Sequence, residues 1–321
     1  PLVGNPLSLQ TPRSSVIFKD GVYRMWYTTE ANGPDTGINY AESANGTDWT
    51  SQGVVLPVGG DGEWDSFHLG GVAVICDGGQ YRLWYGGRQS GLPVEIGYAT
   101  SLDGLDWVRD AGNPVLSEAS SSPTASVYPG TVIQDGGQLQ MWYMYLGSAE
   151  PAVYHATSAN AITWVVTGPV LVGETGAWDA AGAYEPAVVQ HETTYEMWYG
   201  SGSGIGQAES ADGVAWTKSG GNPVLTGGVW YDQAGAATVV LNGGVYRMWY
   251  SGSDGATWRL GYATALSLDP DVPDLTVTPS PADFPDTPVG ASSPMDLTIT
   301  STGIANPVCM FQSLISPSKS S

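Results

Sequence analysis

One short pattern of apolar and polar positions occurs five times along the chain. Each copy is a five-residue segment rich in aromatic and aliphatic side chains that ends in Trp-Tyr. The copies cover residues 23–27, 81–85, 139–143, 195–199 and 246–250. Their tryptophans are separated by 58, 58, 56 and 51 residues. A period in this range, carried by strand-like aromatic segments, indicates a repeat architecture.

The copy between residues 71 and 117 predicts the most complete unit. Val72–Cys76 is a short apolar run, which is typical of a strand buried on both faces. Asp77-Gly78-Gly79 predicts a hairpin turn into a second strand at 81–85. Residues 95–100 and 107–109 predict a third and a fourth strand. Large side chains alternate to both faces of the second strand, so we expect neighbouring sheets to cover both.

Five such units without helical periodicity predict an all-β fold, a five-bladed β-propeller of four-stranded antiparallel blades. The propeller is expected to span residues 1–268, and closing its ring removes exposed sheet edges. The sequence leaves two sources for the outer strand of the fifth blade: residues near 266–278, or residues that preceded Pro1.

The composition changes after residue 268, and residues 269–321 predict a separate segment. An Asp-Pro-rich linker is followed by strand-like stretches at 275–278 and 297–303. These stretches resemble the start of the immunoglobulin-like anchor and accessory domains of secreted bacterial proteins. A complete sandwich needs ~100 residues. We therefore expect a partial segment that forms a short C-terminal β-ribbon or a tail.

Composition narrows the classes of partner. Acidic residues outnumber basic ones by 31 to 10, and the net charge of −21 disfavours nucleic acid and anionic membranes. No apolar run reaches the ~18 residues of a membrane span. Because the chain begins Pro1-Leu2-Val3, we expect a mature or trimmed product. Cys76 and Cys309 form no metal or redox spacing, and we interpret both as structural thiols.

The positions that break the repeat are the candidate binding residues. Aligned on the central tryptophans, the starts of the five inner strands hold Arg13, Gly71, Pro129, Glu185 and Ala236. Tyr128 and Tyr184 precede two of these positions, and His68 and Gln233 lie slightly upstream on equivalent loops. Connections between blades converge near the axis of a propeller, so these side chains are expected around one funnel.

A second repeated motif lies in the loops that lead into the inner strands. It comprises Trp64-Asp65, Trp178-Asp179 and Trp230-Tyr231-Asp232. The aspartates either cap the loops or contact a substrate, and the tryptophans either pack within the scaffold or stack on sugar rings. Small residues at the inner strands leave an axial channel, where a single His and scattered carboxylates would hold at most a structural Ca²⁺ or a water. No other cofactor or metal site is predicted.

The repeat units resemble the five-bladed propeller glycosidases, the arabinanase and xylosidase group with its invertase and levansucrase relatives. The Asp77–Tyr85 hairpin and the Ile96–Ser101 strand carry this resemblance over roughly residues 1–268. In that family, acidic residues project from the starts of inner strands. Tyr184-Glu185-Pro186 matches such a segment, whereas the other four inner-strand starts carry no acid.

The resemblance implies a secreted or cell-surface, bacterial-type, carbohydrate-active protein. One hypothesis is a glycoside hydrolase, in which Glu185 is the general acid and Asp232 or Asp65 the base or nucleophile. It requires two carboxylates ~5–10 Å apart across one pocket. A Glu185 that stands alone, or is paired with Arg13, would argue against it. The candidate substrate-binding residues are Arg13, His68, Tyr128, Asp179, Tyr184, Gln233 and Trp230.

The alternative hypothesis is a non-catalytic, glycan- or protein-binding propeller that belongs to a larger surface protein. The missing acids at the inner-strand starts and the accessory-like segment at 269–321 favour it. We expect a monomer under either hypothesis, and a carbohydrate as the favoured ligand. Binding that survives Glu185→Gln would favour the alternative.

Overall fold

The computed structural model describes residues 13–28, 37–118, 122–147, 151–202, 204–226, 233–253, 258–267, 275–277, 299–301 and 312–313. Within these residues the secondary structure is all β, and most strands form five four-stranded antiparallel sheets. The first two sheets comprise β1 (Ser14–Lys19), β2 (Val22–Thr28), β3 (Gly37–Ser43) and β4 (Thr50–Pro57), then β5 (His68–Asp77), β6 (Gln80–Arg88), β7 (Glu95–Ser101) and β8 (Val108–Arg109). The third and fourth comprise β9 (Ser126–Asp135), β10 (Gln138–Leu146), β11 (Ala152–Ser158) and β12 (Val165–Val172), then β13 (Tyr184–His191), β14 (Thr194–Ser201), β15 (Gly204–Ser210) and β16 (Thr217–Lys218). The fifth comprises β17 (Gln233–Asn242), β18 (Val245–Ser253), β19 (Trp258–Leu266) and β22 (Gln312–Ser313).

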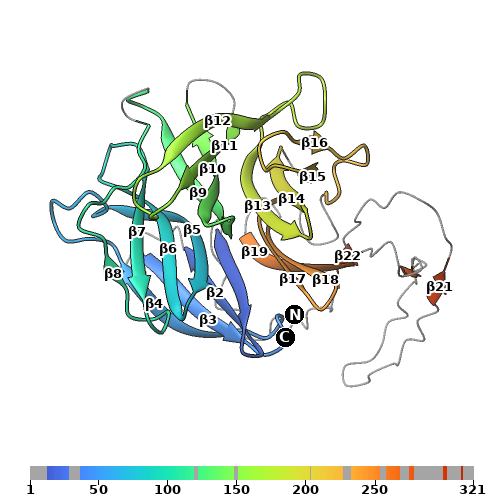
Figure 1. The fold of residues 1–321 in the computed structure, drawn as a ribbon, viewed down its shortest axis with the longest axis horizontal. Helices are drawn as coiled ribbons and strands as arrows, with labels where there is room; N and C mark the ends of the chain where they lie inside the picture. Colours follow the sequence, from blue (N-terminus) through green and yellow to red (C-terminus); the bar gives the residue numbers. More distant parts are fainter. Residues whose placement is uncertain are drawn as a thin grey trace.

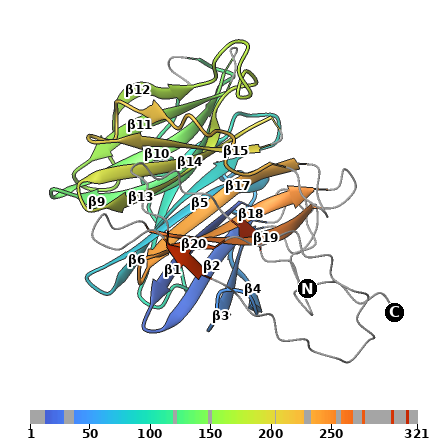
Figure 2. The ribbon, with the colours of Figure 1, turned by 90° about the vertical axis from the view of Figure 1, so that its right-hand side faces the viewer.

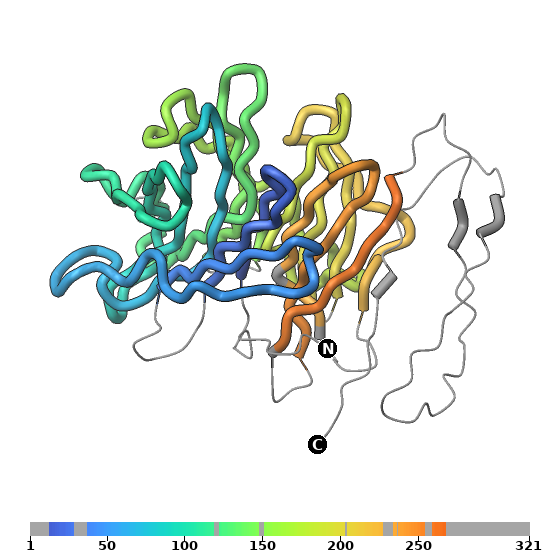
Figure 3. The backbone as a smooth tube through the Cα atoms, turned by 90° about the horizontal axis from the view of Figure 1, so that it is seen from below, coloured from blue at the N-terminus to red at the C-terminus, as the bar shows by residue number. Residues whose placement is uncertain are grey.

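The five sheets are the blades of a propeller, as the repeat predicts. Figure 1 shows them around a common centre, which the first strands of the blades face. Those inner strands contact one another in a ring, β1 to β5 to β9 to β13 to β17 and back to β1. Figure 2 shows the same blades from the side. In Figure 3 the first blade, in blue, lies beside the fifth, in orange, which closes the ring.

The predicted hairpin between β5 and β6 is confirmed. Gly78 and Gly79 have φ values of 57° and 84°, and positive φ at both central residues is what a two-residue type I′ turn requires. The turn sets the register in which Asp77 pairs with Gln80 and Val74 with Leu83. The predicted third and fourth strands of this blade are present as β7 and β8.

Both faces of the second strand are covered, also as predicted. On one face of β6, Tyr81, Leu83 and Tyr85 share a buried cluster with first-blade side chains such as Trp26. On the other face, Trp84 packs with side chains of the third blade. The alternation of side chains along one strand therefore binds a blade to both of its neighbours.

Within the described residues, the repeated tryptophan joins four of the blades to the next blade. Trp26 Nε1 in blade 1 donates a hydrogen bond of 2.8 Å to the backbone oxygen of Gly104 in a turn of blade 2. Trp107, which follows that turn, donates to the same oxygen at 3.1 Å, and the two indoles meet edge to face at 82°. The same bond between blades links Trp84 to Ala161, Trp142 to Gly213 and Trp249 to Gly46.

Hydroxyl groups make a second set of links between blades along the axial channel. The inner strands of different blades do not pair in a sheet, yet Thr131 Oγ1 in β9 accepts a 3.0 Å hydrogen bond from Val188 N in β13. Ser15 Oγ likewise accepts a hydrogen bond from Val74 N, and Thr238 Oγ1 accepts one from Val16 N. These three hydroxyls, eleven residues before the blade tryptophans, line an axial cavity of ≈ 440 Å³.

The fourth strand of the fifth blade comes from neither source that the sequence suggested. Gln312 and Ser313 form β22, which pairs with Thr264 and Ala263 of β19. Two residues carry no recognisable periodicity, so this pairing lies below what a sequence pattern can reveal. Within 269–321, β20 (Leu275–Val277) and β21 (Ile299–Ser301) pair as an antiparallel ribbon.

Candidate functional site

The inner strands of blades 2 to 5 share an irregularity at their starts. In β13 the register shifts between Tyr184 and Ala187, so Glu185 and Pro186 form a bulge. Glu185 has a φ of +54°, a left-handed conformation that costs a non-glycine residue about 1–3 kcal/mol. The equivalent bulge in β5 holds Gly71, with a φ of +73°, where glycine adopts this conformation readily. Blade 4 therefore carries a strained glutamate where blade 2 has a relaxed glycine.

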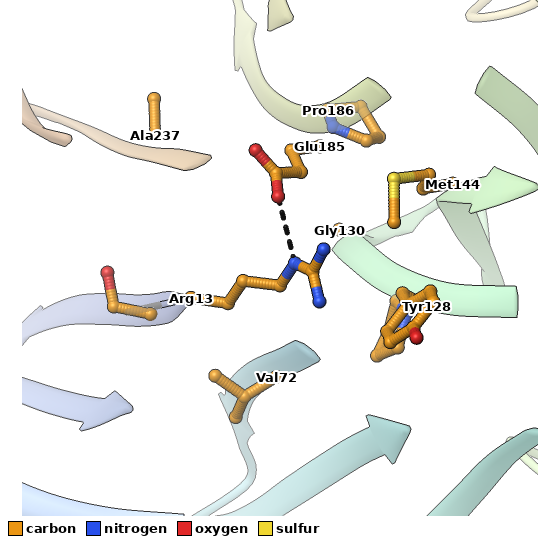
Figure 4. A pocket seen from close by; sticks show the side chains of 10 residues that line it. Arg13, Val72, Tyr128, Gly130, Met144, Glu185, Pro186 and Ala237 are labelled. Carbon is orange, nitrogen blue, oxygen red and sulfur yellow. Dashed lines mark hydrogen bonds and ion pairs between the residues drawn. The ribbon is translucent and has the colours of Figure 1, made fainter. Parts of the chain in front are cut away.

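The Glu185 side chain forms an ion pair with Arg13. Arg13 Nε lies 2.9 Å from Glu185 Oε1, and the two side chains are 19% and 11% exposed. The Arg13 guanidinium also lies 4.4 Å from the centre of the Tyr128 ring, a cation–π contact. Figure 4 shows Arg13 reaching across the axis from blade 1, towards Glu185 of blade 4 and beside Tyr128 of blade 3. Residues from three blades thus meet at one point.

A small pocket surrounds this ion pair. Its space is ≈ 20 Å³, which is room for one water molecule. The lining residues are Arg13, Ser14, Val72, Tyr128, Pro129, Gly130, Met144, Glu185, Pro186 and Ala237. Among these described lining residues Glu185 is the single carboxylate, and it is paired with Arg13. Pairing of Glu185 with Arg13 argues against hydrolysis by the ordinary route, which needs two carboxylates.

His68 lies next to this pocket. The space over Gly70 is shared by two rings: a Cβ added to Gly70 would be 2.6 Å from His68 Nε2 and 3.3 Å from Tyr128 Cε1. Burial and the positive charges of Arg88 and Arg13 lower the pKa of His68, so the imidazole is neutral at pH 7. His68, Tyr128, Arg13 and Glu185 are therefore brought together as predicted, although their roles stay a prediction.

Tyr184, by contrast, makes its described contacts within its own blade. Its hydroxyl donates to the backbone oxygen of Gly202 at 3.2 Å, and its ring covers Gly200. Burial, together with the charge of Glu185, raises the pKa of Tyr184 to about 12.

Asp65 is a buried scaffold residue with two partners. Its Oδ2 accepts hydrogen bonds from the Tyr85 hydroxyl at 3.0 Å and from Arg109 Nε at 2.9 Å, and the side chain is fully buried. Burial and the nearby Asp65 charge raise the pKa of Tyr85 above its ordinary range. These contacts fit the loop-capping interpretation.

Asp179 repeats this arrangement in blade 4. It accepts hydrogen bonds from Tyr199 at 3.1 Å, from Lys218 Nζ at 2.5 Å and from the backbone of Glu174 at 3.1 Å. Burial alone would raise the pKa of Asp179, but the bond from Lys218 and the backbone bond hold the pKa below its ordinary value. Like Asp65, this carboxylate is absent from the residues that line the axial pocket.

The tryptophans beside these aspartates pack on their own blades. Trp64 lies over Tyr85 with ring centres 5.7 Å apart, and Trp178 lies over Tyr199 at the same distance. Trp230 and Asp232 are outside the described residues, and of Gln233 only the backbone, at the start of β17, is described.

Sequence reasoning missed two contributors that also break the repeat. Met144 lines the pocket from β10, at a position where the copies otherwise have Thr28, Gly86, Gly200 and Ser251. Arg88 lies beside His68 at the end of β6. Comparing the second strands as well as the inner strands would have found both.

The described residues hold no group of three or more His, Cys, Asp or Glu side chains arranged to bind a metal ion. The axial Ca²⁺ therefore remains a prediction. Cys76 is a free thiol on the wall of the axial cavity. No helix in the described part of the chain is long and apolar enough to cross a membrane.

Comparison with known sequences gives relatives without an assigned function. No protein-family model matches the chain. Two uncharacterized proteins from two strains of Mycobacterium tuberculosis are each 33% identical over 160 residues, which cover 47% of this chain and 52% of theirs. The chain thus spans about half the length of the curated relatives it matches.

Comparison with solved structures finds glycoside hydrolases. A thermostable family-43 glycoside hydrolase superposes with a TM-score of 0.67 at 18% identity, over 83% of this chain and 93% of that one. A family-32 β-fructofuranosidase of Bombyx mori, in complex with sucrose, gives 0.62 at 13% identity, over 82% and 62%. At these identities the likeness concerns the fold. The chain therefore has the five-bladed propeller fold of these glycoside hydrolases.

Proposed function

We propose that this protein binds carbohydrate at the axial end of the propeller where Arg13, Tyr128 and Glu185 meet. The observation that carries the proposal is the strained Glu185, whose carboxylate is held at the axis by a bulge and paired with Arg13. Strain of this kind persists only where the surrounding structure enforces it, and it clusters at ligand sites.

The chemistry of the three side chains suits a sugar. A guanidinium offers several N–H donors and a carboxylate offers acceptor oxygens, so together they match the paired hydroxyl groups of a pyranose or furanose. The phenol of Tyr128 adds an apolar face with a polar tip. The fold similarity to sugar-cleaving propellers supports the same ligand class.

The size of the pocket suggests how a ligand would bind. Space for one water beside the ion pair admits a single hydroxyl or hydroxymethyl group, with the sugar ring above it. We therefore expect recognition of a chain end or an exposed branch, rather than a polysaccharide threaded through the axis.

Calorimetric titration with neutral and acidic plant and microbial oligosaccharides tests the proposal. We expect at least one ligand that binds the wild type and loses roughly tenfold or more in affinity in Tyr128→Ala and Arg13→Gln, since each removes a direct contact. Tyr154→Ala, a tyrosine of the same blade that does not line the pocket, is the matched control. The proposal is wrong if no oligosaccharide binds, or if neither Tyr128→Ala nor Arg13→Gln lowers the affinity.

Hydrolysis is the second candidate, because one observation keeps it open. A Cβ placed on Gly235 would lie 3.4 Å from Glu185 Oε2, so this oxygen of the carboxylate lies close to β17. Asp232 precedes Gly235 by three residues in the sequence. Product analysis on the same oligosaccharides separates the candidates: cleavage that is lost in both Glu185→Gln and Asp232→Asn favours a hydrolase, and binding without cleavage favours a lectin-like module.

A further inference from the structure

Arg88 stands out among the few cations of this chain. The protein has 10 Lys and Arg residues against 31 acidic ones. Arg109 and Lys218 are each paired with a carboxylate. Among the described residues, the Arg88 side chain has no carboxylate or hydrogen-bond partner. Its guanidinium carbon lies 5.3 Å from the centre of the Phe67 ring. A half-buried guanidinium in this state retains most of its capacity to bind an anion.

Phe67 lies beside Arg88 at the end of β6, and we call this place the rim of blade 2. The ring and the guanidinium together form a binding platform rather than an isolated charge. Its side chain is 48% exposed, which is unusual for a large aromatic residue, and its backbone N–H donates to the backbone oxygen of Arg88 at 3.1 Å. An exposed ring beside a planar cation offers a stacking surface next to a charge. Sugars with an anionic substituent present a matching pair of features.

The platform is continuous with the axial site. His68 and Arg88 are direct cross-strand partners at the start of β5 and the end of β6, so their side chains lie on one face of the blade. His68 Nε2 and the Tyr128 ring flank Gly70, and Tyr128 lies under Arg13. An arc of side chains therefore runs from Arg88 through His68 and Tyr128 to the Arg13–Glu185 pair.

The local charge of this arc is positive even though the protein is acidic. Arg13 offsets Glu185, and Arg109 offsets Asp65, which leaves the charge of Arg88 uncompensated. Glu95 is opposite Gly87, so strand alternation turns it to the face of the sheet away from Arg88. At physiological ionic strength the screening length is about 8 Å, so distant acidic residues act on a bound anion less than Arg88 does.

We propose that the carbohydrate ligand carries an anionic group, a carboxylate or a sulfate, and that Arg88 with His68 binds this group at the rim of blade 2. Arg88 supplies the charge and the planar N–H fork, and neutral His68 donates one ring N–H. Phe67 stacks on the substituted sugar. This inference rests on the proposed carbohydrate function and adds to it the chemical class of the ligand.

Matched ligand pairs test the charge directly. Binding of tri-galacturonate and of its fully methyl-esterified form is measured by calorimetry at 0.15 M salt, alongside a sulfated galactan oligosaccharide and its desulfated form. We expect the charged member of one pair to bind the wild type roughly tenfold more tightly, which corresponds to about 1.4 kcal/mol. The pair that responds distinguishes a carboxylate ligand from a sulfate ligand.

Variants assign the preference to the rim. In Arg88→Gln the affinity ratio of charged to neutral ligand should fall towards one, and Arg88→Lys should restore part of it, because the charge returns without the planar fork. Lys19→Gln removes the same charge at the opposite end of an inner strand and should keep the ratio. Thermal melting checks that each variant is folded.

The outcomes separate this inference from the proposed function. Equal binding of charged and neutral members by the wild type, binding of neutral oligosaccharides alone, or a ratio that survives Arg88→Gln, overturns the inference and leaves the carbohydrate proposal standing. Absence of binding to every oligosaccharide overturns both.

Discussion

The inner and second strands build both the contacts between neighbouring blades and the axial site. The contacts between blades use residues that repeat, whereas the axial site uses residues that differ from blade to blade. At the joints, four blades present the same tryptophan to the same turn of the next blade within the described residues. At the axis, blades 1, 3 and 4 contribute three different residues, Arg13, Tyr128 and Glu185, to one pocket. These four tryptophans are buried and hydrogen-bonded, whereas the axial site stores backbone strain and keeps a pocket. In this molecule, repetition therefore identifies what holds the ring together, and its interruption identifies where a ligand can act.

The largest effect should come from breaking a joint. Trp142→Ala removes a fully buried indole and its bond to the Gly213 carbonyl, and we expect a loss of about 4 kcal/mol in the free energy of unfolding. Chemical denaturation measures this loss. Tyr128→Ala at the axis should cost far less, and a similar cost for both variants would contradict the division between joint and site.

The next effect concerns a repeated carboxylate. Asp179→Asn weakens a buried interaction with Lys218, and we expect a loss of about 3 kcal/mol at pH 7. The folded protein holds the pKa of Asp179 below 3.8, so this stabilisation is present above that pH and disappears as the pH falls through the lower folded value. In denaturation experiments from pH 7 downwards, the stability difference between the wild type and the variant should therefore shrink once the pH falls below 3.8. A difference that grows in acid would contradict this sign.

A smaller effect is expected where hydroxyls link the inner strands. Thr131→Val leaves the Val188 N–H and the Pro186 carbonyl without their partner, at a cost of roughly 1–2 kcal/mol. Ala73 and Ala187 occupy the equivalent positions in blades 2 and 4. Ala73→Ser should make the missing link and leave stability unchanged or slightly higher. Differential scanning calorimetry of both variants distinguishes these outcomes.

The smallest expected difference in stability concerns the strained backbone at Glu185. It gives the most specific test of the contrast between the blade joints and the axial site. Glu185→Gly should be about 1 kcal/mol more stable than Glu185→Ala, because only glycine adopts a φ of +54° without strain. Both variants lose the carboxylate, so both should lose ligand affinity equally. Equal stability of the two would show that the backbone at this position relaxes without cost.

The blade boundaries were predictable from sequence because local chemistry sets them. Asp77-Gly78-Gly79 specifies a turn by itself, and each tryptophan segment needs two covering neighbours. The closing strand β22 was not predictable, since two residues carry no pattern and their partner is almost fifty residues away.

At the site, sequence identified which residues are exceptional but not how they interact. Glu185, Arg13, Tyr128 and His68 were found because they break the repeat, and the structure brings them together. The positive φ of Glu185 was hidden, because a glutamate before a proline carries no signal for a left-handed conformation. The ion pair with Arg13 depends on the exact closure of the ring, which no local pattern encodes.

The most direct test compares two carboxylates under one pair of measurements. Glu185→Gln and Asp179→Asn each exchange one carboxylate for an amide in the same blade, and each variant is assayed for its free energy of unfolding and for its affinity for the best oligosaccharide ligand. We expect Glu185→Gln to lose affinity and to lose less stability than Asp179→Asn, because Asp179 accepts three hydrogen bonds and is more deeply buried. Asp179→Asn should lose stability at unchanged affinity. The reverse pattern, or a loss of affinity in both, would contradict the claim that the ligand site lies where the repeat is broken.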